Sequence, residues 1–281
     1  MKKTRLLLPL LVLSLLFLAA CQDSDTADIH SPAHDIVSDA PDTTELLNRM
    51  QEASKNIQSF RADMQIAQEM TFDGGSATDE AGGPAGIVGD LSMNSDLEME
   101  MTMEPLLAWM KMTLSAPEMD AEGHEMEMYL SEDGVYMNQM GQWMYMAGEQ
   151  AGFNPEEMKQ SYMSEETVEA MREIEDNLVV TEQGDHYLLT YDGDGEDANK
   201  LLELQMQNQE ELPGNMEFNH LKYQYTIEKD TYYPTGIDMD MSFSFTEEVT
   251  MESNQKITGT FSKINEITEI TIPQEALDVK P

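Results

Sequence analysis

The chain has 281 residues, of which 55 are acidic and 15 basic, and its formal net charge at pH 7 is −40. A surface of this charge repels nucleic-acid phosphates and anionic lipid head groups, which argues against DNA or RNA binding and against membrane binding through a basic patch. The length suits one domain with a substantial hydrophobic core, and a single cysteine excludes an intramolecular disulfide.

The start of the chain has the order of a secretory signal. Basic residues come first, an apolar run follows over residues 6–18, and small residues close it at Leu18-Ala19-Ala20-Cys21. The run is too short for a permanent membrane span. The ending resembles the lipobox of bacterial lipoproteins, which implies cleavage before Cys21 and attachment of a diacylglycerol group to its sulfur. We therefore expect a signal peptide at 1–20 and a protein anchored by lipid to the extracytoplasmic face of the cell membrane.

A polar segment follows the expected anchor. Residues 22–41 are rich in Asp, Ser, Thr, Ala and Pro, a composition typical of a disordered tether. A flexible tether of this length would span roughly 25 Å. Together with Cys21 it would connect the membrane to a single domain over 42–281.

The first helix is predicted over 42–60. Asp42 and Glu45 resemble a capping box, and Leu46, Met50, Ala53, Ile57 and Phe60 then recur at helical spacing. Two further helices are expected at 155–176 and 197–208.

Most of the remaining chain alternates between apolar and polar residues, which predicts strands. An Asp133-Gly134 turn indicates a hairpin, and residues 73–89, rich in Gly, indicate a loop. The expected strands lie at 64–72, 97–103, 110–114, 126–130, 135–137, 178–181, 186–191, 221–227, 237–245 and 257–261. Most neighbouring strands have no crossover helix between them, so they should be antiparallel. We predict an α+β fold: a curved, open antiparallel sheet with one wet acidic face and helices packed on its apolar concave face.

This pattern resembles the superfamily of the bacterial lipoprotein carriers LolA and LolB, and within it a family of uncharacterised Gram-positive lipoproteins. The resemblance rests on the lipobox, on Glu52–Phe60 running from helix into strand, on the paired hairpins and on the closing Ile270–Ala276. It implies an open half-barrel with a helical lid over an apolar cavity, in a superfamily whose members carry acyl chains or sense lipidated ligands.

Methionine is unusually frequent, with 25 residues against 8 Phe and 2 Trp. Because methionine is flexible and polarizable, it suits surfaces that adapt to variable apolar partners. The candidate cavity residues are Met64, Met99, Met101, Met103, Met110, Met112, Met128, Tyr225, Met239, Met241 and Phe243. The same methionines would also serve as plain core residues, although a core made mainly of methionine specifies its packing poorly.

Metal binding is a weaker alternative. His124, Met126 and Met128 form a series at strand spacing, and thioethers suit Cu(I), but no second histidine cluster accompanies them. Asp192, Asp194, Glu196 and Glu203 fall at calcium-loop positions, but Asp197 replaces the required glycine, so an acidic turn before a helix is the better interpretation.

The sequence holds no nucleophile elbow, zinc-protease helix or phosphate-binding loop, and we expect no enzymatic activity and no cofactor. Trp109, Trp143 and Tyr145 are expected to be core or lid aromatics rather than a sugar platform. The leading hypothesis is a binding module for an apolar or acylated ligand. The alternatives are an envelope-sensing module that binds a protein partner, and a structural lipoprotein that binds neither.

Overall fold

The computed structural model describes residues 40–73, 90–116, 121–148, 171–172, 174–194, 215–246 and 250–281. Within these ranges the helical elements are α2 (Thr43–Ser54), the 3-10 helix η2 (Glu175–Asn177) and α7 (Gln274–Leu277). The strands are β1 (Ser59–Asp73), β2 (Asp90–Met103), β3 (Leu106–Ala116), β4 (Ala121–Ser131), β5 (Gly134–Gln139), β6 (Gln142–Ala147), β7 (Leu178–Gln183), β8 (His186–Asp194), β9 (Asn215–Glu228), β10 (Pro234–Thr246) and β11 (Thr250–Ser262).

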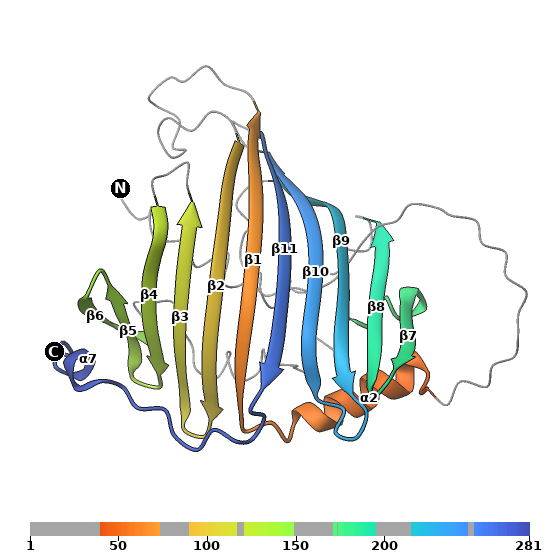
Figure 1. Cartoon of the computed structure of the whole chain (residues 1–281), viewed down its shortest axis with the longest axis horizontal. Coiled ribbons are helices and arrows are strands. Elements are labelled where there is room, and N and C mark those ends of the chain that lie inside the picture. Colours follow the sequence, from red (N-terminus) through yellow and green to blue (C-terminus); the bar gives the residue numbers. More distant parts are fainter. Residues whose placement is uncertain are drawn as a thin grey trace, which may run out of the picture.

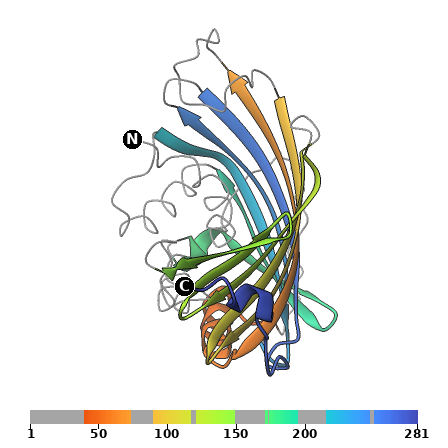
Figure 2. The ribbon, with the colours of Figure 1, turned by 90° about the vertical axis from the view of Figure 1, so that its left-hand side faces the viewer.

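These strands form one open sheet of 11 strands in the order β6-β5-β4-β3-β2-β1-β11-β10-β9-β8-β7 (Figure 1). All of the pairings described between neighbouring strands are antiparallel, as predicted. The central β1 pairs with β2 on one side and with β11 on the other, so it joins two meanders from opposite ends of the chain. The sheet is strongly curved, and its edges β6 and β7 do not pair with each other (Figure 2).

The alternation that predicts the strands also separates the two faces of the sheet. In β1 the even-numbered side chains from Phe60 to Met70 are buried, whereas Gln65 and Glu69 are exposed. Because the side-chain period is two, a slip of one residue would place the apolar set in water, so burial of one face specifies the register. The buried set faces the side on which α2 lies, which is the concave side of the sheet (Figure 2).

Helix α2 begins where the sequence predicts. Asp42 caps it, because its Oδ1 accepts a hydrogen bond of 2.7 Å from the backbone N–H of Glu45. The helix buries Leu46, Leu47 and Met50 against the concave core. The predicted fold has helices packed on the concave face of the sheet, and α2 is packed in this way.

The predicted end of this helix at residue 60 is wrong. The helix ends at Ser54, and Phe60 already belongs to β1, where its ring meets Phe261 edge to face at 6.4 Å. Asn265 ties down the intervening segment: its Oδ1 accepts from the backbone N–H of Gln58 at 2.6 Å, and its Nδ2 donates to the Asn56 carbonyl at 3.0 Å. These bonds come from the far end of the chain, so local spacing gives no sign of them.

The other two predicted helices lie largely outside the described residues. Of 155–176, the described part has Met171 and Arg172 in helical conformation, and the 3-10 helix η2 then covers residues 175–177. The predicted helix at 197–208 and the predicted loop at 74–89 fall outside the described ranges.

The hairpin between β4 and β5 exists, but its turn lies one residue earlier than predicted. Ser131 pairs with Gly134, so the turn residues are Glu132 and Asp133. Gly134 instead opens β5 with φ +148°, and a Cβ atom there would lie 2.4 Å from the Met146 carbonyl oxygen. The glycine is therefore required by the close approach of β6 rather than by the turn.

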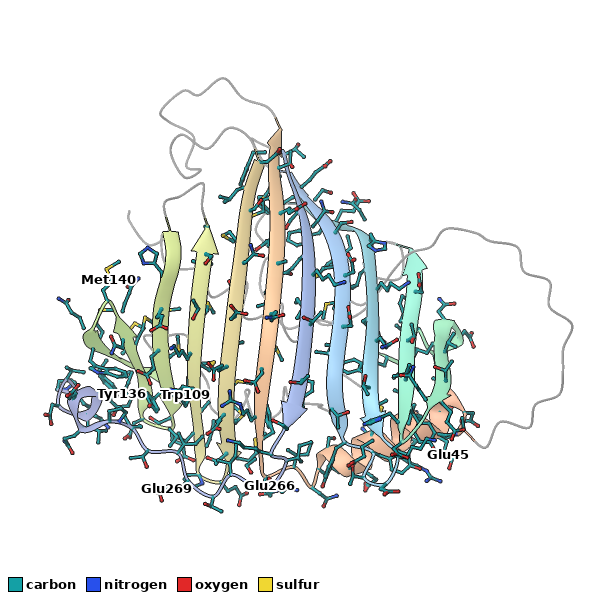
Figure 3. The ribbon with its side chains drawn as sticks, in the orientation of Figure 1. Glu45, Trp109, Tyr136, Met140, Glu266 and Glu269 are labelled. Carbon is teal, nitrogen blue, oxygen red and sulfur yellow. The ribbon has the colours of Figure 1, made fainter. Side chains whose placement is uncertain are left out.

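The convex face is not uniformly wet, which corrects the prediction. A second apolar cluster lies there on β3–β6, with Tyr129 and Tyr136 buried; Tyr136 and Trp109 of this cluster are labelled in Figure 3. The C-terminal segment passes along the lower end of the strands to α7, and Ala276 packs into this cluster (Figure 1). Trp109, Trp143 and Tyr145 are half-buried there, so they are core aromatics of the convex side and not part of a lid over the concave face.

Candidate functional site: the concave face

The concave face brings together all eleven residues predicted to line a cavity. Cross-strand pairing places them on one surface, and all belong to or pack against a single hydrophobic cluster. The buried members are Met64, Met99, Met101, Met110, Met239, Met241 and Phe243, and the half-buried members are Met103, Met112, Met128 and Tyr225. Their role as a ligand site stays a prediction, because burial alone also fits a filled core.

Strand pairing aligns five methionines in a line across β2 to β6. Each is the direct cross-strand partner of the next, and we call the set the methionine row: Met99, Met110, Met128, Met137 and Met144. Direct cross-strand neighbours have Cβ atoms about 5 Å apart. The row is therefore a continuous thioether surface perpendicular to the strands.

Exposure increases along the methionine row toward the edge of the sheet. Met99 and Met110 are buried, Met128 and Met137 are half-buried, and Met144 on the edge strand β6 is 47% exposed. The candidate site predicted from the sequence does not include Met137 and Met144. The alternation predicts that Met137 lies in a strand, but only the register shows that it extends the same line.

The other half of the concave face is aromatic. Tyr191 and Tyr223 stack with ring centroids 5.7 Å apart, and Tyr225 meets Tyr223 edge to face at 5.5 Å. Phe218 and Phe243 meet edge to face at 6.0 Å farther along β9 and β10. Burial raises the pKa of the Tyr225 hydroxyl to about 12.

Three buried polar residues interrupt the apolar face where β1 meets β11. Gln68 and Gln255 are direct cross-strand partners, and Gln68 Nε2 donates to Ser253 Oγ at 3.0 Å. The Gln255 side chain is only 2% exposed, and no donor in the described part of the chain reaches its Oε1. The sequence shows Gln68 as a polar interruption of an apolar strand, and Gln255, two residues before Ile257, carries the same signal on β11.

The metal candidates gain no support from the described residues. His124, Met126 and Met128 lie on one strand, with His124 exposed. Asp192 forms an ion pair with Lys222 across β8 and β9, whereas Glu196 and Glu203 lie outside the described ranges, as does Cys21. No cluster of three or more His, Cys, Asp or Glu residues that could hold a metal occurs in the described ranges. Thioether ligands are not among these residue types, so copper binding by His124, Met126 and Met128 stays a prediction.

The sequence matches the profile of a family described as a family of unknown function, DUF6612, over residues 42–281. The chain belongs to this family. The match spans the described sheet, both of its meanders and the C-terminal segment that ends in α7. No curated protein sequence matches the chain.

Solved structures with partial similarity include LprF from Mycobacterium bovis, which is 10% identical, with 84% of this chain and 98% of that chain covered and a TM-score of 0.43. A DUF1329 family protein from Desulfovibrio piger is also 10% identical, with coverage of 82% and 93% and a TM-score of 0.25. A LolA superfamily protein from Nitrosomonas europaea is 10% identical, with coverage of 84% and 97% and a TM-score of 0.20. Scores below 0.5 do not establish a shared fold, so the function proposed next rests on this chain's own residues.

Proposed function

We propose that this protein is a lipid-anchored envelope lipoprotein that binds an apolar or acylated ligand on its concave face, without transforming it. The observation that carries this proposal is the methionine row. It extends from the buried middle of the sheet to a half-exposed methionine at the β6 edge. An acyl chain lying along the row would contact one thioether after another.

A surface made of methionine can be filled by its own side chains and can still rearrange around a ligand. Its side chain has three rotatable bonds and no branching, so it fills the space when no ligand is present and can change rotamer when one enters. Each methylene of a ligand that leaves water gains about 0.8 kcal/mol. That gain offsets the loss of methionine–methionine contacts, so an open cavity in the unliganded protein is not required.

The route of entry follows from the exposure of the row. Met144 already contacts solvent, and Met137 and Met128 behind it are half-buried. The opposite end of the sheet is covered by α2, which contacts β7 and donates from Arg49 Nη1 to Tyr232 Oη at 2.5 Å. We therefore place ligand entry at the β6 edge, with α2 as the fixed wall.

The membrane anchor is the second part of the proposal. Acylation of Cys21 would hold the domain at the extracytoplasmic face of the cell membrane, with residues 22–41 as tether. In the described ranges no helix is long and apolar enough to cross a bilayer. A net charge of −40 also works against electrostatic adsorption to anionic lipid, which makes the covalent anchor the means of attachment.

The test is native mass spectrometry with lipid extraction on residues 22–281, secreted by a bacterial host. This segment holds every contact described here and omits Cys21, so a detected acyl chain is bound non-covalently. We expect a discrete co-purifying acyl lipid. A clean apo mass that stays unchanged after incubation with phosphatidylglycerol vesicles would contradict the proposal. A stoichiometric protein partner without bound lipid would favour the sensing module instead.

A matched pair of variants on β5 locates the site. Met137 points to the concave face and its neighbour Asn138 to the convex face, and both are half-buried. Met137→Asp puts a charge in the methionine row and should reduce lipid retention at least tenfold, because an unpaired carboxylate against an acyl chain is strongly unfavourable. Asn138→Asp adds the same charge outside the row and should retain lipid as the wild type does. Equal retention by both variants would rule out the row, provided their far-UV spectra match the wild type.

A further inference from the structure

The buried glutamine Gln255 has a hydrogen-bond acceptor that the described structure does not use. Its side chain is 2% exposed, and no described donor reaches Oε1. The neighbouring Gln68 is different, because its amide nitrogen donates to Ser253 Oγ at 3.0 Å. Buried polar atoms in proteins are almost always paired, and each exception calls for a functional or structural reason.

The four described side chains next to this acceptor on the concave face are all uncharged. Across the strands its direct partners are Gln68 on β1 and Met241 on β10. Along β11 the nearest side chains on the same face are Ser253 and Ile257, both buried. A ligand's polar group bound at this position would therefore lie beside a carbonyl oxygen that lacks a hydrogen-bond donor. None of these four neighbours could neutralise a charge on that group.

We propose that Gln255 Oε1 accepts a hydrogen bond from an uncharged hydroxyl or amide N–H of an acylated ligand. This inference rests on the function proposed above and narrows its ligand class. Phe261 of β11 is level with the methionine row and Gln255 lies six residues from it, so the polar group of the ligand would bind apart from the row, between β1 and β10. An ionised fatty acid fits poorly, because its carboxylate offers only acceptors and would be buried without a counter-charge. A fatty alcohol, an acyl glycerol or an N-acyl compound supplies the donor.

We expect the Gln255 acceptor to distinguish ligands that have a hydrogen-bond donor from ligands that lack one, while burial of the alkyl chain supplies most of the affinity. A bound donor removes the cost of an unpaired carbonyl, whereas a ligand of the same length without a donor leaves that cost in place. The affinity difference expected from one such hydrogen bond is about 3- to 10-fold.

The experiment compares 1-dodecanol with its methyl ether, 1-methoxydodecane, by titration calorimetry on residues 22–281. The ether replaces the O–H donor by O–CH3 and keeps the alkyl chain. In wild-type protein we measure the ratio of the two affinities, and we then measure the same ratio in Gln255→Met. The variant keeps the length and flexibility of the side chain but removes the acceptor. The affinity for 1-dodecanol divided by the affinity for 1-methoxydodecane should be about 3- to 10-fold lower in Gln255→Met than in the wild type.

Two controls separate this effect from a change of fold or of site shape. Ile257→Leu alters the neighbour of Gln255 two residues along β11 and keeps the acceptor, so its ratio should equal that of the wild type. Gln255→Leu removes the acceptor with a different side chain and should reproduce Gln255→Met. Removing a buried carbonyl that lacks a donor should not lower the melting temperature of either Gln255 variant.

The outcomes distinguish this inference from the proposed function. An unchanged ratio in both Gln255 variants, with both probes bound, would overturn the role of Gln255 and leave the apolar site intact. Failure of wild-type protein to bind either probe would overturn both proposals. A ratio that falls equally in Ile257→Leu would also overturn the inference, because the acceptor is still present in that variant.

Discussion

Arg61 shows how single residues on the convex face offset part of the acidic charge. Its Nε donates to Asp63 Oδ2 at 2.8 Å, and its Nη2 donates to Glu98 Oε2 at 2.6 Å. Nη1 is 3.4 Å from Glu100 Oε1, which also accepts from Lys263 Nζ at 2.7 Å. These hydrogen bonds hold the pKa of Arg61 above its ordinary range, and the Lys263 hydrogen bond is the main cause that lowers the pKa of Glu100.

The lowered pKa of Glu100 predicts a pH-dependent contribution to stability. Its ion pairs stabilise the folded state above the ordinary carboxyl pKa, and this contribution is lost as the pH falls through the lowered pKa. Glu100→Gln should therefore reduce the free energy of unfolding by about 1 kcal/mol at pH 7 and by almost nothing in acid. Urea unfolding at a series of pH values measures the difference.

The control for Glu100→Gln is Glu69→Gln on the same convex face. The cross-strand partners of Glu69 are Ser92 and Asn254, so this variant reports the general effect of removing one negative charge. A pH-independent difference between the two variants would contradict the assignment.

At the scale of elements, the C-terminal segment covers the convex aromatic cluster. Ala276 of α7 is fully buried with Tyr129 and Tyr136. Beneath it, Trp109 Nε1 and the Tyr129 hydroxyl both donate to Glu127 Oε1, at 2.8 and 3.2 Å. Burial, with the Glu127 carboxylate as a second cause, raises the pKa of Tyr129 to about 12. A four-residue helix is thus held in place by packing rather than by its own stability.

This packing predicts that α7 tolerates no larger side chain at its buried position. Ala276→Leu should lower the free energy of unfolding by about 1–3 kcal/mol, because the added methylenes have no space beside the two tyrosines. Leu277→Ala, at a neighbouring position that is 39% exposed, should change it by less than about 0.5 kcal/mol. Chemical denaturation monitored by tryptophan fluorescence measures both. Equal effects would mean that α7 is not docked as the structure shows.

At the scale of the whole molecule, the excess of negative charge opposes compaction. Without Lys2, Lys3 and Arg5 the mature chain would carry 12 basic and 55 acidic residues, a net charge of −43. Ion pairs such as Lys111–Glu125, with 2.7 Å between Nζ and Oε1, use only the few cations that the chain has. The remaining carboxylates repel one another in both meanders of the sheet.

We therefore expect salt to stabilise the domain. Raising NaCl from about 10 mM to about 500 mM shortens the screening distance several-fold and should raise the melting temperature of residues 22–281. Chloride is used rather than sulfate because sulfate also strengthens hydrophobic burial. A flat or falling melting temperature over this range would show that repulsion does not limit stability.

The sequence by itself determined the local parts of this structure. The period of two located the strands and assigned Met101 and Met241 to the apolar face, because alternation is a property of each strand alone. Asp42 likewise located the start of α2, since the cap acts within one turn. The open antiparallel sheet followed from these elements and their short connections.

Only the tertiary structure decided which residues meet across the sheet. Register aligned five methionines from five strands into one row and put Gln68 opposite Gln255, although neither strand alone contains this information. Asn265 holds the segment between α2 and β1 through bonds to Asn56 and Gln58, and the C-terminal segment covered a face that the pattern predicts to be wet. The reason is physical: alternation depends on neighbours two residues apart, whereas register and coverage depend on contacts between residues far apart in the chain.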